Sequence, residues 1–216
     1  KNLVSFFEDF IDIEILQFQS KNSESILDQR IQECDVLIHL AGVNRPTNEK
    51  EFDLINYGLT KKILDLLQKY NKDVPIIFTS STQVKDNNAY GKSKYKAEQL
   101  LLRQQEKQKN GVYILRLPGV FGKWCKANYN SVVATFCHNI ANNLPIEIHD
   151  PQAIITILYI DDLVRNIYSF ITNLPDMDNP ITLAPTYKIS LQELADKVNL
   201  FHKYANSGQL SVSDKA

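Results

Sequence analysis

Short hydrophobic runs and longer amphipathic stretches alternate along the first half of the chain. The runs are typical of strands and occupy residues 11–16, 36–40, 75–80 and 112–117. Between them, residues 55–70 carry an apolar stripe at helical spacing, and residues 89–108 predict a second helix. Strands separated by helices of this length predict an α/β doubly wound parallel sheet, in which ligands bind beyond the carboxyl ends of the strands.

After Leu117 the pattern changes. Residues 117–130 contain two glycines, a proline and no sustained period, which predicts a long loop. Ser190 and Glu193 have the spacing of a capping box, which predicts a helix that starts near Leu191. The remaining elements that we expect are a helix at 131–142, strands at 146–150 and 154–160, and a helix introduced by Asp161 and Asp162.

Composition and charge narrow the functional classes. Hydrophobic residues make up 44% of the chain and charged residues 23%, as in ordinary globular proteins, and the net charge of -1 argues against nucleic-acid binding. The three cysteines show no metal-ligand spacing and are expected to be reduced thiols in a cytoplasmic protein. The same near-neutral charge favours a small-molecule partner. No apolar run is long enough to cross a membrane, and no signal-peptide pattern is present.

The stretch NNAYGKSKYKAEQ, at residues 87–99, places a tyrosine and a lysine one helical turn apart. Tyr90 and Lys94 share a helix face, because residues four apart project to the same side. A free tyrosine has a pKa of about 10, and a nearby ammonium favours the phenolate, so we expect Lys94 to lower the pKa of Tyr90 toward that of an acid/base catalyst. The alternative is an exposed pair without a chemical role.

Small and hydroxyl-bearing residues follow two of the predicted strands. Ser80, Ser81 and Thr82 end the run FTSST, where a hydroxyl can hydrogen-bond a substrate carbonyl. Ala41 and Gly42 follow the preceding strand and permit a flat ligand to approach the backbone, although a tight turn would use the same residues. His39 and His138 lie within a predicted strand and a predicted helix, and we interpret both as structural.

Several motifs together resemble the extended short-chain dehydrogenase/reductases that act on nucleotide sugars. They are VLIHLAG, Asn56, FTSS, YGKSK and YIDDL, in the order and spacing of that family, and the resemblance covers roughly residues 1–200. It implies a Rossmann-like fold with a small C-terminal substrate lobe. We expect an NAD(P)-binding domain in residues 1–120, and substrate-binding segments interleaved with the last sheet strands in residues 121–216.

The resemblance also implies roles for single residues. Tyr90 would be the catalytic acid/base, Lys94 its partner and a ribose ligand, and Ser81 the hydrogen-bond donor to the substrate, with Ser80 as the competing choice. Asn56 would be a structural or relay residue. The residues expected to contact the cofactor are Ser20, Lys21, Leu40, Ala41, Gly42, Asn56, Lys94 and Pro118. The turn at Ser20 and Lys21 lacks a carboxylate, which favours NADP over NAD, although plain surface residues are the alternative.

A narrower similarity connects AGVNRP and FGKWCKANYNSVVATFCHNIANN to the reductase domain of bifunctional capsular-polysaccharide enzymes that make the UDP-N-acetyl-L-fucosamine precursor. It implies NADPH-dependent reduction of the 4-keto group of a UDP-2-acetamido-2,6-dideoxyhexulose. In that family a cupin domain follows, and the resemblance implies that the present sequence would be the reductase part alone. The family's Gly-x-x-Gly-x-x-Gly turn, which binds the cofactor pyrophosphate, has no counterpart in the sequence. We therefore expect the first strand and glycine loop to be missing, and NADPH binding by this 216-residue chain to be weak.

The substrate is expected to contact a separate set of residues, namely Asn44, Arg45, Thr82, Gln83, Lys123, Trp124 and Lys126. Many relatives carry an arginine before the YIDD segment, and PQAIITILYI has none, so Arg45, Lys123 and Lys126 are candidates for phosphate contacts. Trp124 could stack on uracil or plug the substrate lobe, and the three cations could equally be solvated surface residues.

The sequence as a whole predicts an NADPH-dependent nucleotide-sugar reductase that forms a homodimer. Thr82 and Gln83 stand where the family's dehydratases carry Asp-Glu, which argues against dehydration. The alternatives are a redox-neutral nucleotide-sugar epimerase of the same fold, and a catalytically silent scaffold or binding module.

Overall fold

Three parallel strands form the first sheet of the protein, which we describe from a computed structural model for residues 1–107, 109–173 and 179–207. They are β1 (Leu37–His39), β2 (Ile76–Ser81) and β3 (Val112–Leu117), in the order β1-β2-β3. In β2 only Thr79 is not buried, as the continuous apolar run predicts for a central strand covered on both faces. The predicted doubly wound parallel α/β arrangement is confirmed in this sheet.

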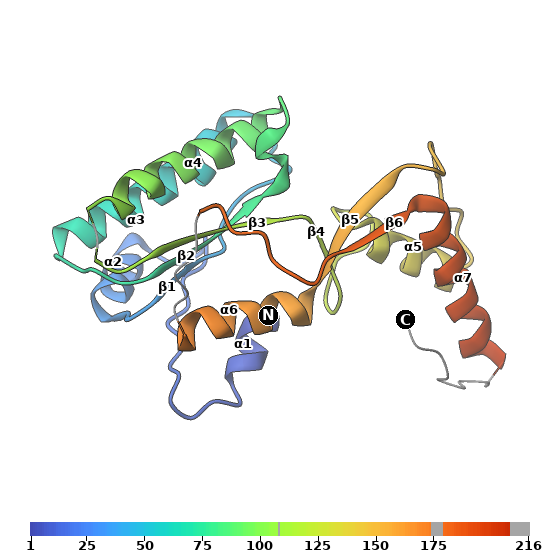
Figure 1. The fold of residues 1–216 in the computed structure, drawn as a ribbon, viewed down its shortest axis with the longest axis horizontal. Helices are drawn as coiled ribbons and strands as arrows, with labels where there is room; N and C mark the ends of the chain where they lie inside the picture. Colours follow the sequence, from blue (N-terminus) through green and yellow to red (C-terminus); the bar gives the residue numbers. More distant parts are fainter. Residues whose placement is uncertain (108, 174–178, 208–216) are drawn as a thin grey trace. The chain divides into compact units, whose positions relative to one another are not determined.

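Helices cover both faces of the β1-β2-β3 sheet (Figure 1). Helices α3 and α4 lie on one face, and α6 lies on the other, where the ring centroid of Phe170 is 5.8 Å from that of Tyr113 in β3. The helical elements that belong wholly or partly to the same part of the molecule as this sheet are α1 (Asn2–Phe7), α2 (Glu24–Glu33), η1 (Phe52–Gly58, a π-helix), α3 (Leu59–Lys69), η2 (Thr82–Lys85, a 3-10 helix), α4 (Ala89–Gln105) and α6 (Ile160–Thr172).

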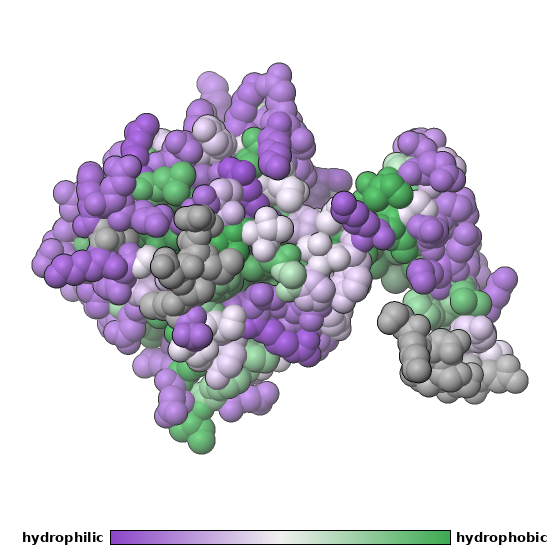
Figure 2. All heavy atoms as spheres, viewed as in Figure 1, coloured by the Kyte–Doolittle hydropathy of each residue, from purple (hydrophilic) through white to green (hydrophobic). Residues whose placement is uncertain are grey.

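The chain divides into two compact units, of which the first holds the described residues within 3–118 and 163–183. Its core is formed by the apolar stripe of α3 together with β2, β3 and α4, and includes Leu67, Ile76, Phe78, Leu101 and Ile114. The face of this unit that Figure 2 shows is mostly hydrophilic, with scattered hydrophobic residues. Helix α3 thus packs its apolar side against the sheet, as the pattern of residues 55–70 predicts, and its polar side faces solvent.

The second unit holds residues 119–162 and the described residues from 184 on. Its elements are β4 (Gly119–Phe121), α5 (Val132–Ala141), β5 (Ile154–Tyr159), β6 (Tyr187–Ser190) and α7 (Leu191–Ser207). Strand β5 pairs in parallel with β4 and antiparallel with β6. Helices α5 and α7 share a small core with Phe136, Ile140 and Leu194.

The capping box that begins α7 is confirmed by both of its hydrogen bonds. The backbone N–H of Glu193 donates to Ser190 Oγ at 3.1 Å, and the N–H of Ser190 donates to Glu193 Oε2 at 2.9 Å. The carboxylate therefore accepts from the backbone, which lowers the pKa of Glu193. Asp161 and Asp162, by contrast, lie inside the first turn of α6 rather than before it, where negative charge still interacts favourably with the helix dipole.

Three sequence predictions of local structure are wrong. Residues 11–16 form no strand, because alternation alone does not supply a paired neighbour, and Ile11 is fully exposed. Residues 146–150 also form no strand, although Ile146 and Ile148 pack their side chains against the α5–α7 core. The predicted loop 117–130 contains β4, whose three residues are too few to show a period.

Candidate active site

The helix that carries Tyr90 and Lys94 begins beside the carboxyl end of β2. Asn88 caps α4, with its Oδ1 accepting from the N–H of Gly91 at 2.6 Å. Gly91 is buried because the first turn of α4 lies directly against η2, and a Cβ there would overlap the carbonyl oxygen of Gln83. The glycine between Tyr90 and Lys94 thus allows α4 to start against the segment that follows Ser81.

Replacing Gly91 with alanine tests this close fit. Because the added methyl meets backbone rather than a flexible side chain, we expect the free energy of unfolding to fall by about 2 kcal/mol. Gly58→Ala is the matched control, since its Cβ would lie 3.6 Å from the nearest atom, the carbonyl oxygen of Asp53, which is ordinary contact. Urea unfolding of both variants measures the difference. Equal stabilities would contradict the fit.

Tyr90 and Ser81 meet at the end of β2. Tyr90 is partly buried, with its ring centroid 6.0 Å from that of Phe52. Burial raises the pKa of Tyr90 above its usual 10.0, and a hydrogen bond from the Ser81 side chain partly offsets that rise. The expectation that Lys94 lowers the pKa of Tyr90 is wrong for this structure, because burial of the phenol outweighs the other influences on it. A raised pKa keeps the Tyr90 hydroxyl protonated at neutral pH.

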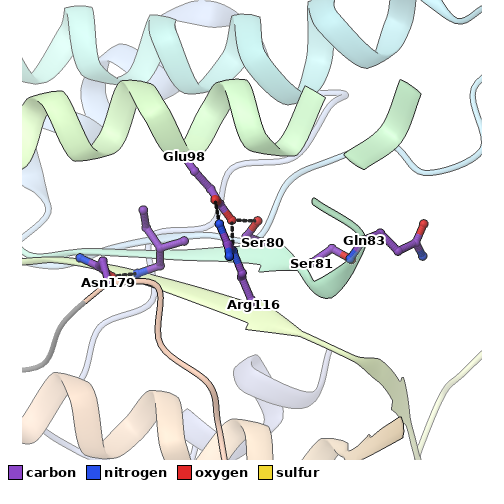
Figure 3. Close-up of polar contacts among 7 residues, drawn as sticks. Ser80, Ser81, Gln83, Glu98, Arg116 and Asn179 are labelled. Carbon is purple, nitrogen blue, oxygen red and sulfur yellow. Dashed lines mark hydrogen bonds and ion pairs between the residues drawn. The ribbon is translucent and has the colours of Figure 1, made fainter. Parts of the chain in front are cut away.

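Ser80 is engaged elsewhere. Its hydroxyl donates to Glu98 Oε1 of α4 at 2.5 Å and lies in the buried layer between strand and helix (Figure 3). The Ser81 hydroxyl instead accepts from the N–H of Gln83 at 3.2 Å and interacts with Tyr90. Of the two serines that the sequence left open, the geometry favours Ser81 as the partner of Tyr90.

Lys94 is a buried cation. Its side chain is inward, the residue is only 3% exposed, and Nζ lies 4.2 Å from the centroid of the Phe78 ring. Burial lowers the pKa of Lys94 from 10.5 to about 8, and the negative charge of Glu98 opposes that decrease. Within the described part of the chain, the Lys94 ammonium has no hydrogen-bond acceptor and no ion-pair partner, so its donors are available to a ligand.

Asn56 is completely buried in the π-helix η1, and its side chain holds the backbone that follows β1. Its Oδ1 accepts from the N–H of Val43 at 2.7 Å, and its Nδ2 donates to the carbonyl of Val43 and to Ser93 Oγ, both at 2.9 Å. Ser93 in turn donates to the carbonyl of Tyr90 at 2.7 Å. These bonds use both amide hydrogens and one lone pair of the carbonyl oxygen, which favours a structural role for Asn56 over a relay, and they join the loop after β1 to the start of α4.

The residues after β1 that are expected to contact the cofactor lie next to Asn56 and Lys94 at Gly42. A Cβ at Gly42 would lie 3.1 Å from Asn56 Oδ1 and 3.6 Å from Lys94 Nζ. Leu40, Ala41 and Gly42 are all exposed, so the backbone there is open beside the Lys94 ammonium. An exposed small-residue edge next to a buried ammonium without an acceptor fits a dinucleotide whose ribose hydroxyls accept hydrogen bonds.

Of the two histidines interpreted from the sequence as structural, His39 is buried and His138 is exposed, so burial supports that interpretation for His39 alone. His39 Nε2 lies 2.9 Å from Thr60 Oγ1, and burial together with the Lys94 charge lowers the pKa of His39 to about 3. His39 is therefore neutral at physiological pH. His138 is exposed in the last turn of α5. The three cysteines are free thiols.

The other residues that are predicted to contact cofactor or substrate in the first unit lie in exposed loops and turns or next to strand ends. Thr82 and Gln83 are exposed on η2, beside Ser81, and Pro118 follows the end of β3. Ser20 and Lys21 lie in an exposed turn after the segment 11–19. Asn44 and Arg45 are exposed in the loop after Val43. Tyr90, Ser81, Lys94, Asn56 and Gly42 are thus the predicted residues that the first unit gathers at one edge of its sheet.

Lys123, Trp124 and Lys126 belong to the second unit. Lys123 Nζ lies 3.4 Å from Asp161 Oδ2, and Lys126 Nζ lies 5.5 Å from the centroid of the Tyr129 ring. Trp124 is 58% exposed with φ of 61°, a backbone conformation that is uncommon for a residue with a side chain. The tryptophan therefore does not plug the core of this unit, which was one of its two alternatives.

Sequence reasoning missed Glu98. It lies one turn beyond Lys94 on α4, is 1% exposed, and forms a two-pronged ion pair with Arg116 of β3 (Figure 3). The signal was present, since Tyr90, Lys94 and Glu98 follow one another at four-residue steps along one helix face. Among the described residues there is no cluster of His, Cys, Asp and Glu that could hold a metal ion. No described helix has the length and apolar character to cross a bilayer.

Comparison with known proteins places the chain among relatives of the kind that its motifs predict. It is 39% identical over 209 residues to a UDP-2-acetamido-2,6-beta-L-arabino-hexul-4-ose reductase from Pseudomonas aeruginosa, covering 96% of this chain and 56% of the relative. It is 38% identical to the crystal structure of the capsular polysaccharide assembling protein CapF from Staphylococcus aureus, with a TM-score of 0.84 over 95% of this chain and 56% of that one. The chain thus spans about half the length of these relatives.

A more distant structure shares the fold. The UDP-glucuronic acid 4-epimerase from Bacillus cereus, solved in complex with NAD, is 18% identical with a TM-score of 0.71, over 83% of this chain and 62% of that one. Residues 10–183 match the NAD dependent epimerase/dehydratase family, a range that includes every residue gathered around Tyr90 and Lys94. The protein belongs to the NAD dependent epimerase/dehydratase family.

Proposed function

We propose that the natural full-length protein reduces the 4-keto group of a UDP-2-acetamido-2,6-dideoxyhexulose with NADPH, in the synthesis of a capsular or O-antigen polysaccharide precursor. The observation that carries this proposal is the 39% identity, across nearly the whole chain, to a reductase whose name specifies such a 4-ketosugar. The likeness to CapF, a capsular polysaccharide protein, supports the same assignment.

The chain's own residues suit this chemistry. A bound reduced nicotinamide would supply the hydride, which goes to the carbonyl carbon of the sugar. Tyr90 donates its phenolic proton to the oxygen that becomes negative, and its raised pKa keeps that proton in place until it is needed. Ser81, at the end of β2 beside Tyr90, donates a hydrogen bond that orients the carbonyl. Lys94 holds the ribose through its unshared ammonium donors.

The protonated state of Tyr90 bears on the epimerase alternative. An epimerase that works through transient oxidation first removes a proton from a hydroxyl, which requires the phenolate, and a raised pKa leaves little Tyr90 phenolate at neutral pH. A reductase needs an acid, for which the same tyrosine is well prepared. The environment of Tyr90 therefore supports reduction over epimerisation.

Consumption of NADPH tests the proposal. Purified full-length protein, incubated with a UDP-4-keto-6-deoxy-N-acetylhexosamine, is expected to oxidise one NADPH per sugar reduced, and to use NADPH better than NADH. Preference for NADPH is proposed from the turn at Ser20 and Lys21, which carries no carboxylate to repel a 2'-phosphate. Interconversion of two UDP-sugars without net loss of NADPH would replace the reductase assignment with the epimerase.

The loop of the second unit is proposed to bind the UDP portion of the substrate. Its support is the exposed Trp124 indole, which can stack on uracil, between two lysines that can contact phosphate. Joint replacement of Lys123, Trp124 and Lys126 by alanine is expected to weaken UDP binding about 10-fold or more while leaving NADPH affinity within about 2-fold. Calorimetry with UDP and with NADPH measures both. Unchanged UDP affinity would remove this loop from the substrate site.

A further inference from the structure

Glu98 is a carboxylate buried in the layer between α4 and the sheet. The residue is 1% exposed, and both of its oxygens are occupied (Figure 3). Arg116 donates from Nε to Oε1 at 3.0 Å and from Nη2 to Oε2 at 2.7 Å, and Ser80 Oγ donates to Oε1 at 2.5 Å. Glu98 therefore joins α4 to β2 through Ser80 and to β3 through Arg116.

Stability alone is a poor explanation for this arrangement. Removing two charges from water is costly, and a buried ion pair can often be replaced by apolar residues with little loss of stability. Glu98 is, however, close to two residues of the candidate site, Lys94 on α4 and Ser81 on β2. It follows Lys94 by one helical turn on the same face of α4, and its partner Ser80 is the neighbour of Ser81 on β2.

The groups that surround Lys94 show why a nearby anion matters. Phe78 faces its Nζ from β2, and Gly42, after β1, lies close to it, since a Cβ there would be 3.6 Å from Lys94 Nζ and 3.1 Å from Asn56 Oδ1 of η1. His39 of β1 is neutral at physiological pH, because its pKa is about 3. Tyr90, on the same helix, keeps its proton, because its pKa is raised. Within the part of the chain that the structure describes, Glu98 is the negative charge that acts on Lys94 and raises its pKa against the effect of burial.

We propose that Glu98 is a positioning residue of the candidate site, whose negative charge keeps the buried Lys94 side chain cationic. The inference rests on the proposed function only in giving Lys94 a role in cofactor binding. Arg116 has a complementary task, since its guanidinium donates to both oxygens of the Glu98 carboxylate and so offsets its negative charge within the layer.

The test measures Lys94 directly. Lysines labelled with ¹³C at Cε are titrated by NMR in the natural full-length protein, and the Lys94 signal is assigned by its loss in Lys94→Arg. Glu98→Gln keeps the side-chain shape and removes the charge. The parent is expected to titrate at about 8. Glu98→Gln is expected to titrate about one pH unit lower.

A double variant separates charge from packing. Glu98→Gln alone leaves the Arg116 guanidinium without its carboxylate, and so destabilises the fold. Glu98→Gln/Arg116→Met removes both charges and is expected to recover much of the lost stability, yet Lys94 should still titrate about one unit lower than in the parent. A merely structural role predicts that stability and titration recover together. An unchanged Lys94 midpoint in both variants would overturn the inference.

The dependence of NADPH affinity on pH provides a second test. If Lys94 loses its proton one unit earlier, NADPH affinity in the double variant falls about 5-fold at pH 8 and hardly at all at pH 6. A loss of equal size at both pH values would contradict the inference. If the parent fails to reduce the 4-ketosugar while the Lys94 midpoint still moves, the proposed function fails and the role of Glu98 stands. An active parent whose Lys94 midpoint does not move would instead support the proposed function and overturn the role of Glu98.

Discussion

Tyr90→Phe in the full-length protein is expected to lower kcat for sugar reduction by about 10² to 10⁴-fold with little change in the KM values. The substitution keeps the aromatic ring against Phe52 and deletes only the hydroxyl that neutralises the developing alkoxide. The fold should be retained, because the lost group lies at the open end of β2 and interacts there with Ser81. Steady-state kinetics and a thermal unfolding curve of the same preparation measure both parts of this prediction.

Tyr95→Phe provides the matched control for this substitution. Tyr95 lies on the same helix and is 47% exposed, so loss of its hydroxyl should leave kcat unchanged. The pH profile adds a further constraint. Because the pKa of Tyr90 is raised, its proton is retained through the neutral and mildly alkaline range, and any alkaline loss of activity near pH 8 belongs to Lys94 instead. Parental turnover by Tyr90→Phe would remove Tyr90 from the reaction.

Lys94→Met is expected to make the protein more stable and at the same time unable to hold the cofactor well. Lys94 is 3% exposed, and its pKa of about 8 is below its usual 10.5. Keeping this side chain charged in the fold therefore costs up to about 3 kcal/mol at pH 7, which methionine does not incur. Loss of the ammonium donors should weaken NADPH binding by about 10 to 100-fold.

The pH dependence of this gain in stability has a definite sign. Between about pH 8 and 10.5 the unfolded chain binds more protons at Lys94 than the folded chain does, so the parent's free energy of unfolding rises with pH in that window. The advantage of Lys94→Met is thus largest at pH 7 and below, and shrinks to less than about 1 kcal/mol at pH 10. Urea unfolding at both pH values measures it, with Lys92→Met, at an exposed position of α4, as control. A variant less stable than the parent at pH 7 would contradict the assigned cost of the buried charge.

The elements that could be predicted from the sequence are those in which the spacing of apolar side chains indicates which residues are buried. The mostly apolar runs at residues 75–80 and 112–117 correspond to β2, the central strand of the first sheet, and to its neighbour β3. Residues 11–16 alternate as a strand should, but a strand exists only when a neighbour shares its hydrogen bonds, and spacing carries no information about neighbours. Strand β4 was not predicted although it has a paired neighbour, because its three residues, one of them a glycine, are too few to show a period.

The candidate site divides in the same way. The four-residue step from Tyr90 to Lys94 was readable, because a helix fixes which residues share a face. The direction of the pKa shift at Tyr90 was not readable, since it depends on how deeply the phenol is buried, which the spacing does not state. Ser80 and Ser81 are adjacent and chemically alike, and only the alternation of β2 sends one toward Glu98 and the other toward Tyr90.

Transfer of deuterium from the cofactor to the sugar tests the central claim most directly. The full-length protein is incubated with a UDP-4-keto-6-deoxy-N-acetylhexosamine and NADPH that carries deuterium at nicotinamide C4, on the face that is transferred. Reduction predicts one deuterium at C4 of the product sugar, one NADP⁺ formed for each, and near loss of both in Tyr90→Phe. A product without deuterium, formed while the NADPH remains unoxidised, would contradict the reductase assignment and establish epimerisation instead.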